Sequence, residues 1–172
     1  MLTHSQIDNC CNYIISKMPV YYTGQKLACL AMYEVGCRAK ESIKPELWEP
    51  FGTEAIILHP QKGNDNRLFL RSELPSPWLD KIENNPTFFE PLTYRKLEYA
   101  INQLIYHCGI HIEGKDSVCH LFRHNYVKKL LDNGNDADQI KTKLGERTMK
   151  ATESYINSQV NYRFFDPEIF GF

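Results

Sequence analysis

The residues best suited to chemistry stand in the last third of the chain, between His120 and Tyr155. His120 and Arg123 are three positions apart, so a helix would carry both side chains on one face. The start of a helix offers unpaired backbone N–H groups, and the guanidinium fork of an arginine matches two oxygens of one phosphate. The spacing therefore predicts a site for an anion such as phosphate.

This segment resembles the C-terminal signature of the tyrosine recombinases, the phage-integrase family of site-specific DNA strand-transfer enzymes. The family signature is a His-x-x-Arg-His helix start, a turn with glycine, a Leu-Gly-His step and a tyrosine nucleophile. The matching steps here are His120-Leu-Phe-Arg123-His124, Gly134, Leu144-Gly145-Glu146 and Tyr155. The resemblance implies catalytic roles for His120, Arg123 and Tyr155 and a supporting role for His124. The alternative for Tyr155 is a half-buried packing residue.

Glu146 departs from the signature, because the family usually has histidine or tryptophan at this step. An ionised carboxylate cannot donate a hydrogen bond to a phosphate oxygen, and it would repel a nearby phosphate. We expect Glu146 to be turned aside, protonated or paired with a cation such as its neighbour Arg147. Each arrangement leaves the site one donor short, so reduced activity is expected.

The remaining charges of the site are expected upstream. Residues 27–41 resemble the apolar helix that ends in Thr-Gly-Leu-Arg-x-x-Glu in the family. The resemblance assigns Arg38 as the first catalytic arginine and Glu41 as the carboxylate that supports it. It also assigns Lys62 as the catalytic lysine that the family carries on a β-hairpin. Solvated surface cations are the alternative for Arg38 and for Lys62.

The chemistry that the resemblance implies is transesterification without ATP. The hydroxyl of Tyr155 would attack a DNA phosphodiester, giving a 3′-phosphotyrosyl bond and a free 5′-hydroxyl, and a second strand's 5′-hydroxyl would reverse the step. An ordinary tyrosine has a pKa of about 10, so His120 would act as a base or as an orienting donor. Arg38 and Arg123 would neutralise the developing charge on the non-bridging oxygens, and Lys62 would protonate the leaving oxygen. No metal ion or other cofactor is expected.

The charge distribution agrees with a DNA-binding surface in the same region. The whole chain has a net charge of −1, whereas residues 115–150 hold eight lysines and arginines against five acidic residues, a local +3. Candidates for contacts with backbone phosphates are Lys128, Lys129, Lys141, Lys143, Arg147 and Lys150. An ordinary surface of mixed charge is the alternative. The resemblance implies double-stranded DNA as the partner and a homotetramer on that DNA.

Composition suits one domain with a substantial core, because 42% of the 172 residues are hydrophobic. No stretch has the length of uncharged apolar sequence that a membrane span needs, and we expect no secretion, because the first residues lack the pattern of a basic and then apolar leader. We therefore expect a cytoplasmic protein that associates with the nucleoid when bound to DNA.

The six cysteines form no Cys-x-x-Cys step and are expected to be reduced. His107, Cys108 and His111 are expected to be surface or packing residues rather than metal ligands.

Apolar periodicity and turn residues predict the secondary structure. The expected helices span 5–18, 25–35, 77–83, 93–108, 120–131, 136–144 and 148–157. Two β-rich runs, 55–59 and 67–71, flank a Gly-Asn-Asp-Asn turn and predict a hairpin. The fold class is therefore α+β and mainly helical. The resemblance implies an integrase-type catalytic domain with a small antiparallel hairpin or sheet on one edge.

The domain organisation follows from how much of the chain the resemblance covers. It extends over nearly all of residues 1–172, without the separate DNA-clamping domain that precedes the catalytic domain in this family. Both a single-domain member and a piece of a longer protein fit this observation. The aromatic tail, residues 158–172, is expected to cover its own domain or to dock on a neighbouring subunit.

Two other functions compete with that of an active recombinase. They are a DNA-binding relative with weak or lost catalysis and a type IB topoisomerase.

Overall fold

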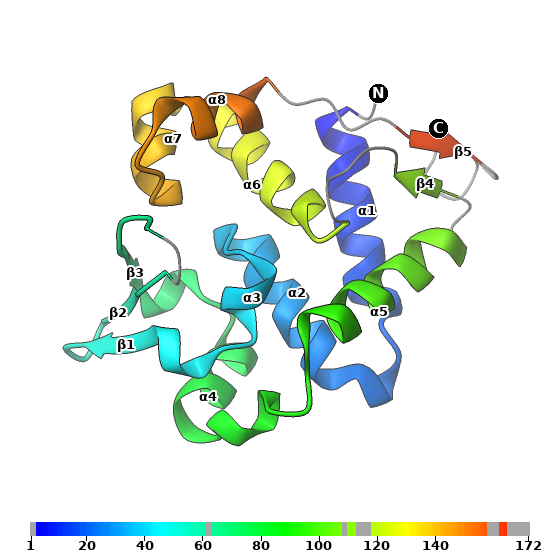
Figure 1. Ribbon diagram of the computed structural model, residues 1–172, viewed down its shortest axis with the longest axis horizontal. Coiled ribbons are helices and arrows are strands. Elements are labelled where there is room, and N and C mark those ends of the chain that lie inside the picture. Colours follow the sequence, from blue (N-terminus) through cyan, green and yellow to red (C-terminus); the bar gives the residue numbers. More distant parts are fainter. Residues whose placement is uncertain (1–2, 61–62, 108–109, 113–117, 158–161, 165–172) are drawn as a thin grey trace.

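The computed structural model describes residues 3–60, 63–107, 110–112, 118–157 and 162–164. Helices dominate these ranges, as Figure 1 shows, and a small antiparallel sheet lies at one side of them. The helices are α1 (His4–Lys17), α2 (Thr23–Val35), α3 (Ala39–Ser42), α4 (Ser76–Asn84), α5 (Tyr94–His107), α6 (His120–Asp132), α7 (Ala137–Leu144) and α8 (Met149–Ile156). The prediction of a mainly helical α+β protein is therefore confirmed.

Local sequence signals account for most helix boundaries. The Thr3 hydroxyl accepts a hydrogen bond from the backbone N–H of Gln6, which caps α1 in the way that short polar residues satisfy the free N–H groups of a first turn. Thr93 caps α5 similarly, since its hydroxyl accepts from the N–H of Lys96 at 3.2 Å. The predicted ends of the seven long helices agree with the structure to within about two residues. The four-residue helix α3 was not predicted, because it is too short to carry a periodic pattern.

The predicted hairpin is present, and a third strand extends it. Strand β2 (Ala55–Leu58) pairs with β3 (Arg67–Leu70) in antiparallel register, with Leu58 opposite Arg67. Strand β1 (Trp48–Phe51) pairs with the other edge of β2. We did not predict β1, because it is four residues long and contains a proline, which sheets accept mainly at an edge.

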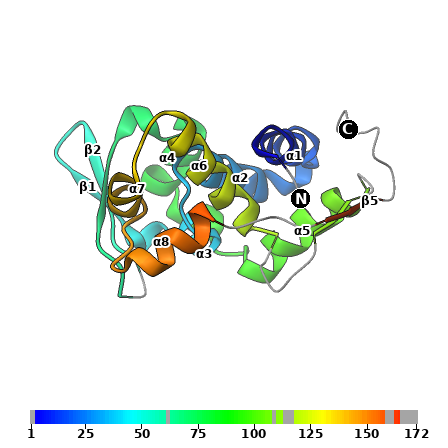
Figure 2. The ribbon, with the colours of Figure 1, turned by 90° about the horizontal axis from the view of Figure 1, so that it is seen from above.

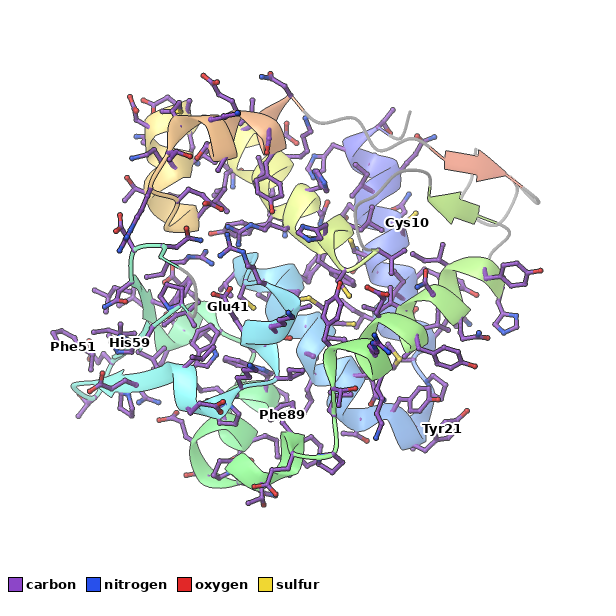
Figure 3. All side chains as sticks on the ribbon, in the orientation of Figure 1. Cys10, Tyr21, Glu41, Phe51, His59 and Phe89 are labelled. Atoms are coloured by element: carbon purple, nitrogen blue, oxygen red, sulfur yellow. The ribbon has the colours of Figure 1, made fainter. Side chains whose placement is uncertain are left out.

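The hydrophobic core lies where α1, α2, α5 and α6 pack together (Figures 1 and 2). Figure 3 shows Cys10 of α1 and Glu41 of α3 within the body of the molecule, whereas Phe51 lies at the outer end of the sheet. A second, smaller hydrophobic cluster lies where α6, α7 and α8 pack together. Its buried members are Val127, Leu130, Ile140 and Leu144, with Tyr155 and Ile156 packed against them. Helix α6 contributes to both clusters and therefore joins the two parts of the core.

A second, two-stranded sheet involves the C-terminal tail. Strand β4 (Ile110–Ile112) pairs antiparallel with β5 (Tyr162–Phe164) of the same chain. The other tail residues, 158–161 and 165–172, lie outside the described residues, so docking of the tail on a neighbouring subunit stays a prediction. None of the described helices combines the length and apolar character that crossing a membrane requires.

Candidate functional site

The turn between α2 and α3 positions Arg38. Helix α2 ends at Gly36, which has a φ of +63°, and a Cβ atom there would lie 2.3 Å from Cδ1 of Tyr126. Only glycine fits this combination of a left-handed backbone and a close neighbour. Two residues later, Arg38 precedes α3, and its backbone N–H donates to Oε1 of Glu41 at 2.7 Å. Glu41 is buried and lies beside Arg38, where the sequence predicted a supporting carboxylate.

Helix α6 supplies the second arginine from the opposite side. The side chain of Arg123 is buried, and its Nη1 donates to the backbone oxygen of Gly36 at 2.7 Å. Its Nη2 donates to the backbone oxygen of Leu144 at 3.3 Å and to Oε1 of Glu146 at 2.8 Å. Arg123 therefore ties the end of α2 to the end of α7, besides presenting its charge to the site.

Glu146 lies between the two arginines. Helix α7 ends at Gly145, whose φ of +70° lets the chain turn back and bring Glu146 inward. Oε1 of Glu146 accepts from Nη2 of Arg38 at 3.0 Å and from Nη2 of Arg123 at 2.8 Å. Of the three arrangements expected for Glu146, the structure shows pairing with a cation, and the cations are Arg38 and Arg123 rather than Arg147. The Nε of Arg147 instead lies 3.3 Å from Oδ1 of Asp65.

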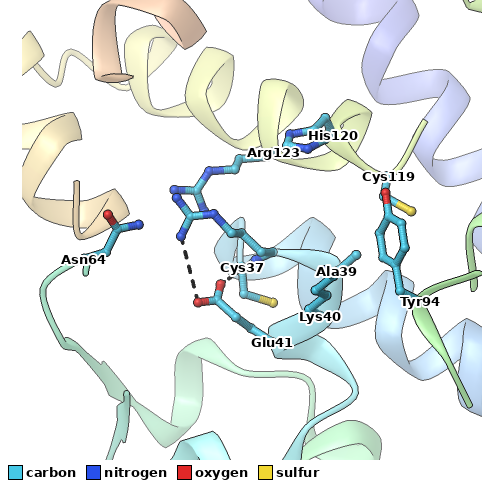
Figure 4. A pocket seen from close by; sticks show the side chains of 10 residues that line it. Cys37, Ala39, Lys40, Glu41, Asn64, Tyr94, Cys119, His120 and Arg123 are labelled. Carbon is cyan, nitrogen blue, oxygen red and sulfur yellow. Dashed lines mark hydrogen bonds and ion pairs between the residues drawn. The ribbon is translucent and has the colours of Figure 1, made fainter. Parts of the chain in front are cut away.

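Arg38 and Arg123 border a cavity of about 430 Å³, seen from close by in Figure 4. In that view His120 and Arg123 project from α6, and Glu41 lies across from them on α3. The residues that line the cavity are Cys37, Arg38, Ala39, Lys40, Glu41, Asn64, Tyr94, Cys119, His120 and Arg123. The structure therefore brings Arg38, His120 and Arg123 to one hollow, although 82 positions separate Arg38 from His120.

Tyr155 reaches the site from α8. Its hydroxyl oxygen lies 3.3 Å from Nδ1 of His120. Its ring centroid lies 5.2 Å from the guanidinium carbon of Arg123 and 5.3 Å from the ring of His124. The tyrosine is thus partly buried by packing, and its hydroxyl also lies at hydrogen-bond distance from a histidine of the cavity. The two expectations for Tyr155, packing and chemistry, are compatible in this arrangement.

The loop between β2 and β3 closes another side of the site. The carboxamide of Asn64 lies 2.7 Å from both terminal nitrogens of Arg38, and it accepts a hydrogen bond from each of them once its oxygen, rather than its nitrogen, is turned towards the arginine. The next residue, Asp65, donates its backbone N–H to the oxygen of Gly145 at 2.9 Å. The loop is therefore attached to the same α7–α8 turn that carries Glu146. Lys62, the predicted catalytic lysine of this loop, lies outside the described residues.

Two residues near the site were not predicted from the sequence, Asn64 and Arg67, and Arg67 is a buried cation on β3. Nη2 of Arg67 donates to the oxygen of Val35 at 2.6 Å, and its guanidinium carbon lies 4.6 Å from the ring centroid of Phe69. Burial, followed by the nearby charge of Arg123, lowers the pKa of Arg67 from its ordinary value to about 10. Among the described residues, no hydrogen-bond partner meets its Nε or Nη1. The sequence did contain one signal for the burial of Arg67, namely an arginine within an otherwise apolar strand.

Cys37 also lines the cavity, but its chemistry is suppressed. Burial raises the pKa of its thiol to about 12, and the charge of Glu41 raises it further than burial alone. Because the thiolate is the reactive form of cysteine, Cys37 is a poor nucleophile at neutral pH.

Within the described ranges, no group of three or more histidine, cysteine or acidic side chains is arranged to hold a metal ion. Cys108, one of the residues considered for a metal, lies outside those ranges.

The six candidates for DNA phosphate contacts fall into three groups. Lys128 donates to the backbone oxygen of Ile156 at 2.9 Å, and the Nζ of Lys129 lies 4.3 Å from the ring centroid of Tyr33, so both already support the packing of α6. Arg147 is exposed beside Asp65. The other three are at least partly exposed and remain candidates: Lys141, Lys143 and Lys150.

Comparison with known proteins adds no relative. No protein-family model matches the chain, and a search of curated proteins finds no significantly similar sequence.

Proposed function

We propose that this protein is a tyrosine-type site-specific recombinase that cleaves and rejoins DNA strands. The observation that carries the proposal is the contact between Tyr155 and His120 beside the two arginines of the cavity. The tyrosine hydroxyl lies 3.3 Å from the imidazole, and Arg38 and Arg123 both donate to one oxygen of an anionic group. A nucleophile, a base and a pair of anion-binding donors are the parts that phosphodiester transesterification needs.

Each side chain has a defined part in the proposed reaction. The Tyr155 oxygen attacks phosphorus, its proton passes to His120, and a 3′-phosphotyrosyl bond forms as the bond to the 5′-oxygen breaks. The two arginines stabilise the charge that builds on the non-bridging oxygens. Lys62 gives a proton to the departing 5′-oxygen, and the 5′-hydroxyl of another strand then attacks the phosphotyrosine in reverse. The energy of the broken bond is retained in the covalent intermediate, so no ATP is consumed.

The proposal extends to the fold type and the partner. An integrase-type catalytic domain of a mobile element would bind double-stranded DNA, assemble as a homotetramer on it, and reside with the nucleoid. The local charge of +3 in residues 115–150 supports DNA as the partner. The exposed Lys143 and Lys150 flank the α7–α8 turn that carries Glu146, so they are suited to contact phosphates next to the scissile one.

The experiment that tests the proposal is capture of the covalent intermediate. The purified chain is incubated with nicked duplexes, in which the strand end diffuses away after cleavage and prevents religation. A protein–DNA band that resists denaturation and disappears after protease treatment is the expected result. Relaxation of supercoiled plasmid without strand exchange would instead indicate type IB topoisomerase chemistry. No adduct with any duplex that the protein binds would contradict both enzymatic functions.

A second candidate is a DNA-binding relative with weak catalysis. Glu146 favours it, because its carboxylate occupies donors of Arg38 and Arg123 that a phosphate would need. Both candidates predict DNA binding, and they differ in the rate at which the adduct accumulates: the recombinase forms it readily, whereas the relative with weak or lost catalysis forms it far more slowly or not at all. Duplex binding is measured by fluorescence anisotropy on the same samples.

A further inference from the structure

One oxygen of Glu146 receives hydrogen bonds from both arginines of the site. The donor atoms are Nη2 of Arg38 at 3.0 Å and Nη2 of Arg123 at 2.8 Å. The side chain of Glu146 is 5% exposed and that of Arg123 is 2% exposed, so the contact between these two side chains is shielded from water, whereas Arg38 is 35% exposed. Charge-assisted hydrogen bonds are stronger in such surroundings than at an exposed surface. The carboxylate is therefore firmly held.

The position of this carboxylate is one that suits a phosphate oxygen. Guanidinium groups are donors that proteins commonly use to bind phosphate, and two of them converge on this oxygen. A carboxylate and a phosphate repel each other at this range, so the two anions cannot share the donors. We infer that Glu146 is an internal competitor for the phosphate site, and that it must leave Arg38 and Arg123 before a phosphate binds there. The inference rests on the proposed function in taking phosphate as the ligand.

The contacts of the neighbouring residues link this displacement to the β2–β3 loop. The oxygen of Gly145 accepts from the N–H of Asp65 at 2.9 Å, and Arg147 lies 3.3 Å from the carboxylate of Asp65. Asn64, the residue before Asp65, contacts the same guanidinium group of Arg38 that Glu146 contacts. When Glu146 leaves, Arg38 keeps Asn64 as a partner. Release of the carboxylate therefore frees one Nη2 donor on each arginine without dismantling the site.

The test measures binding of inorganic phosphate, which needs neither DNA nor catalysis. Glu146→Gln retains the size of the side chain and an acceptor oxygen but removes the charge. Glu90→Gln is the matched control, because Glu90 is exposed and does not line the cavity, and the change in net charge is identical. Phosphate is titrated by calorimetry at constant ionic strength against chloride. Thermal unfolding is followed in parallel.

The expected dissociation constant for phosphate is roughly tenfold or more lower in Glu146→Gln than in the parent, as loss of a competing charge-assisted hydrogen bond predicts. Glu90→Gln should match the parent. Phosphate should raise the unfolding temperature of Glu146→Gln more than that of the parent. The double variant Glu146→Gln/Arg38→Gln should lose the gain, which locates the bound phosphate at the arginine pair. If Glu146→Gln fails to fold without phosphate, Glu146→Ala, which removes the carboxylate without adding a donor, takes its place in every comparison.

Equal or weaker phosphate binding by Glu146→Gln would overturn the inference and would mean that Glu146 holds the two arginines in their binding geometry. A gain that persists in the double variant would also overturn it. The outcome is separable from that of the proposed function. A protein that forms no DNA adduct but shows the gain contradicts only the recombinase, whereas an adduct without the gain contradicts only the competition by Glu146.

Discussion

The hydroxyl oxygen of Tyr155 lies 3.3 Å from Nδ1 of His120, a residue 35 positions earlier in the chain. At this distance the phenol can pass its proton to the imidazole without moving far. Helix α6 carries the histidine and α8 carries the tyrosine, and these helices pack against each other through the smaller hydrophobic cluster. The packing of α8 therefore decides whether the proposed nucleophile meets its base.

Replacement of Tyr155 by phenylalanine should abolish the covalent DNA adduct while leaving DNA affinity and the unfolding temperature almost unchanged. The ring, which packs near Arg123 and His124, is retained and only the attacking oxygen is lost. Adduct yield on nicked duplexes is the measurement. Tyr99→Phe is the control, because Tyr99 is 58% exposed on α5 and does not line the cavity. An undiminished adduct in Tyr155→Phe would exclude Tyr155 as the nucleophile.

Replacement of His120 by asparagine should slow strand cleavage by about 10²–10⁴-fold, the usual contribution of a general base. The variant keeps a polar side chain of similar reach but cannot take up the proton of Tyr155. Single-turnover cleavage of nicked duplexes by the two proteins, at equal DNA occupancy, is the measurement. A cleavage rate in His120→Asn equal to that of the parent would show that His120 does not act as the base.

The two arginines should differ in their effect on stability. Arg123→Met removes a buried cation that donates to Gly36, Leu144 and Glu146, so the free energy of unfolding should fall by about 3 kcal/mol or more. Arg38→Met should cost about 1 kcal/mol or less, because Arg38 is 35% exposed and Glu146 keeps its other partner. Urea unfolding of both variants gives the comparison. Equal losses would mean that the buried contacts of Arg123 add no more stability than the partly exposed contacts of Arg38.

Substitution of Gly145 by alanine should loosen the attachment of the β2–β3 loop. Gly145 has a φ of +70°, and a Cβ atom there would lie 2.7 Å from the backbone oxygen of Asp65. Gly134→Ala is the matched control, because Gly134 has a φ of +84° but no atom within 4 Å of the added Cβ. Backbone strain should cost about 1–2 kcal/mol in each variant, and the clash should add about 1–3 kcal/mol in Gly145→Ala alone. Equal unfolding free energies of Gly145→Ala and Gly134→Ala would show that the loop moves to relieve the clash without loss of stability.

The buried thiols should make the protein less stable in alkali. Burial raises the pKa of Cys37 to about 12 and those of Cys11 and Cys29 well above the ordinary value near 9. The unfolded chain therefore loses these protons first, so their contribution to stability is complete below about pH 9 and declines as the pH rises towards 12. Each thiol should contribute a slope of about 1.4 kcal/mol per pH unit in this interval.

Urea unfolding at several pH values between 8 and about 10.5 checks this alkaline decline. Cys37→Ala should show a shallower decline than the parent by the slope of one thiol. Subtracting the unfolding free energy of one protein from that of the other at each pH removes the contribution of the lysines and tyrosines that both proteins contain. Parallel curves would mean that Cys37 titrates similarly in the folded and unfolded states.

The sequence by itself determined the helices and the local pairs of site residues. Helix α7 illustrates this, since Asp136 accepts from the N–H of Gln139 at its start and Gly145 turns left-handed at its end, and both signals lie within the segment. The proximity of Arg38 and Glu41 was predictable for the same reason, because three positions on a helical turn are neighbours. Such features depend on backbone geometry within a few residues.

Only the tertiary structure decided which partners the buried charges have. Glu146 is adjacent to Arg147 in sequence, yet it pairs with Arg123 and Arg38, which are 23 and 108 positions away. The burial of Arg67 could not be predicted from the sequence for the same reason, since it depends on the packing of β3 against the end of α2. A buried charge pairs with whichever opposite charge shares its enclosed volume, because separation from water makes an unpaired ion costly. That volume is formed by α3, α6 and the α7–α8 turn together, and no single segment specifies it.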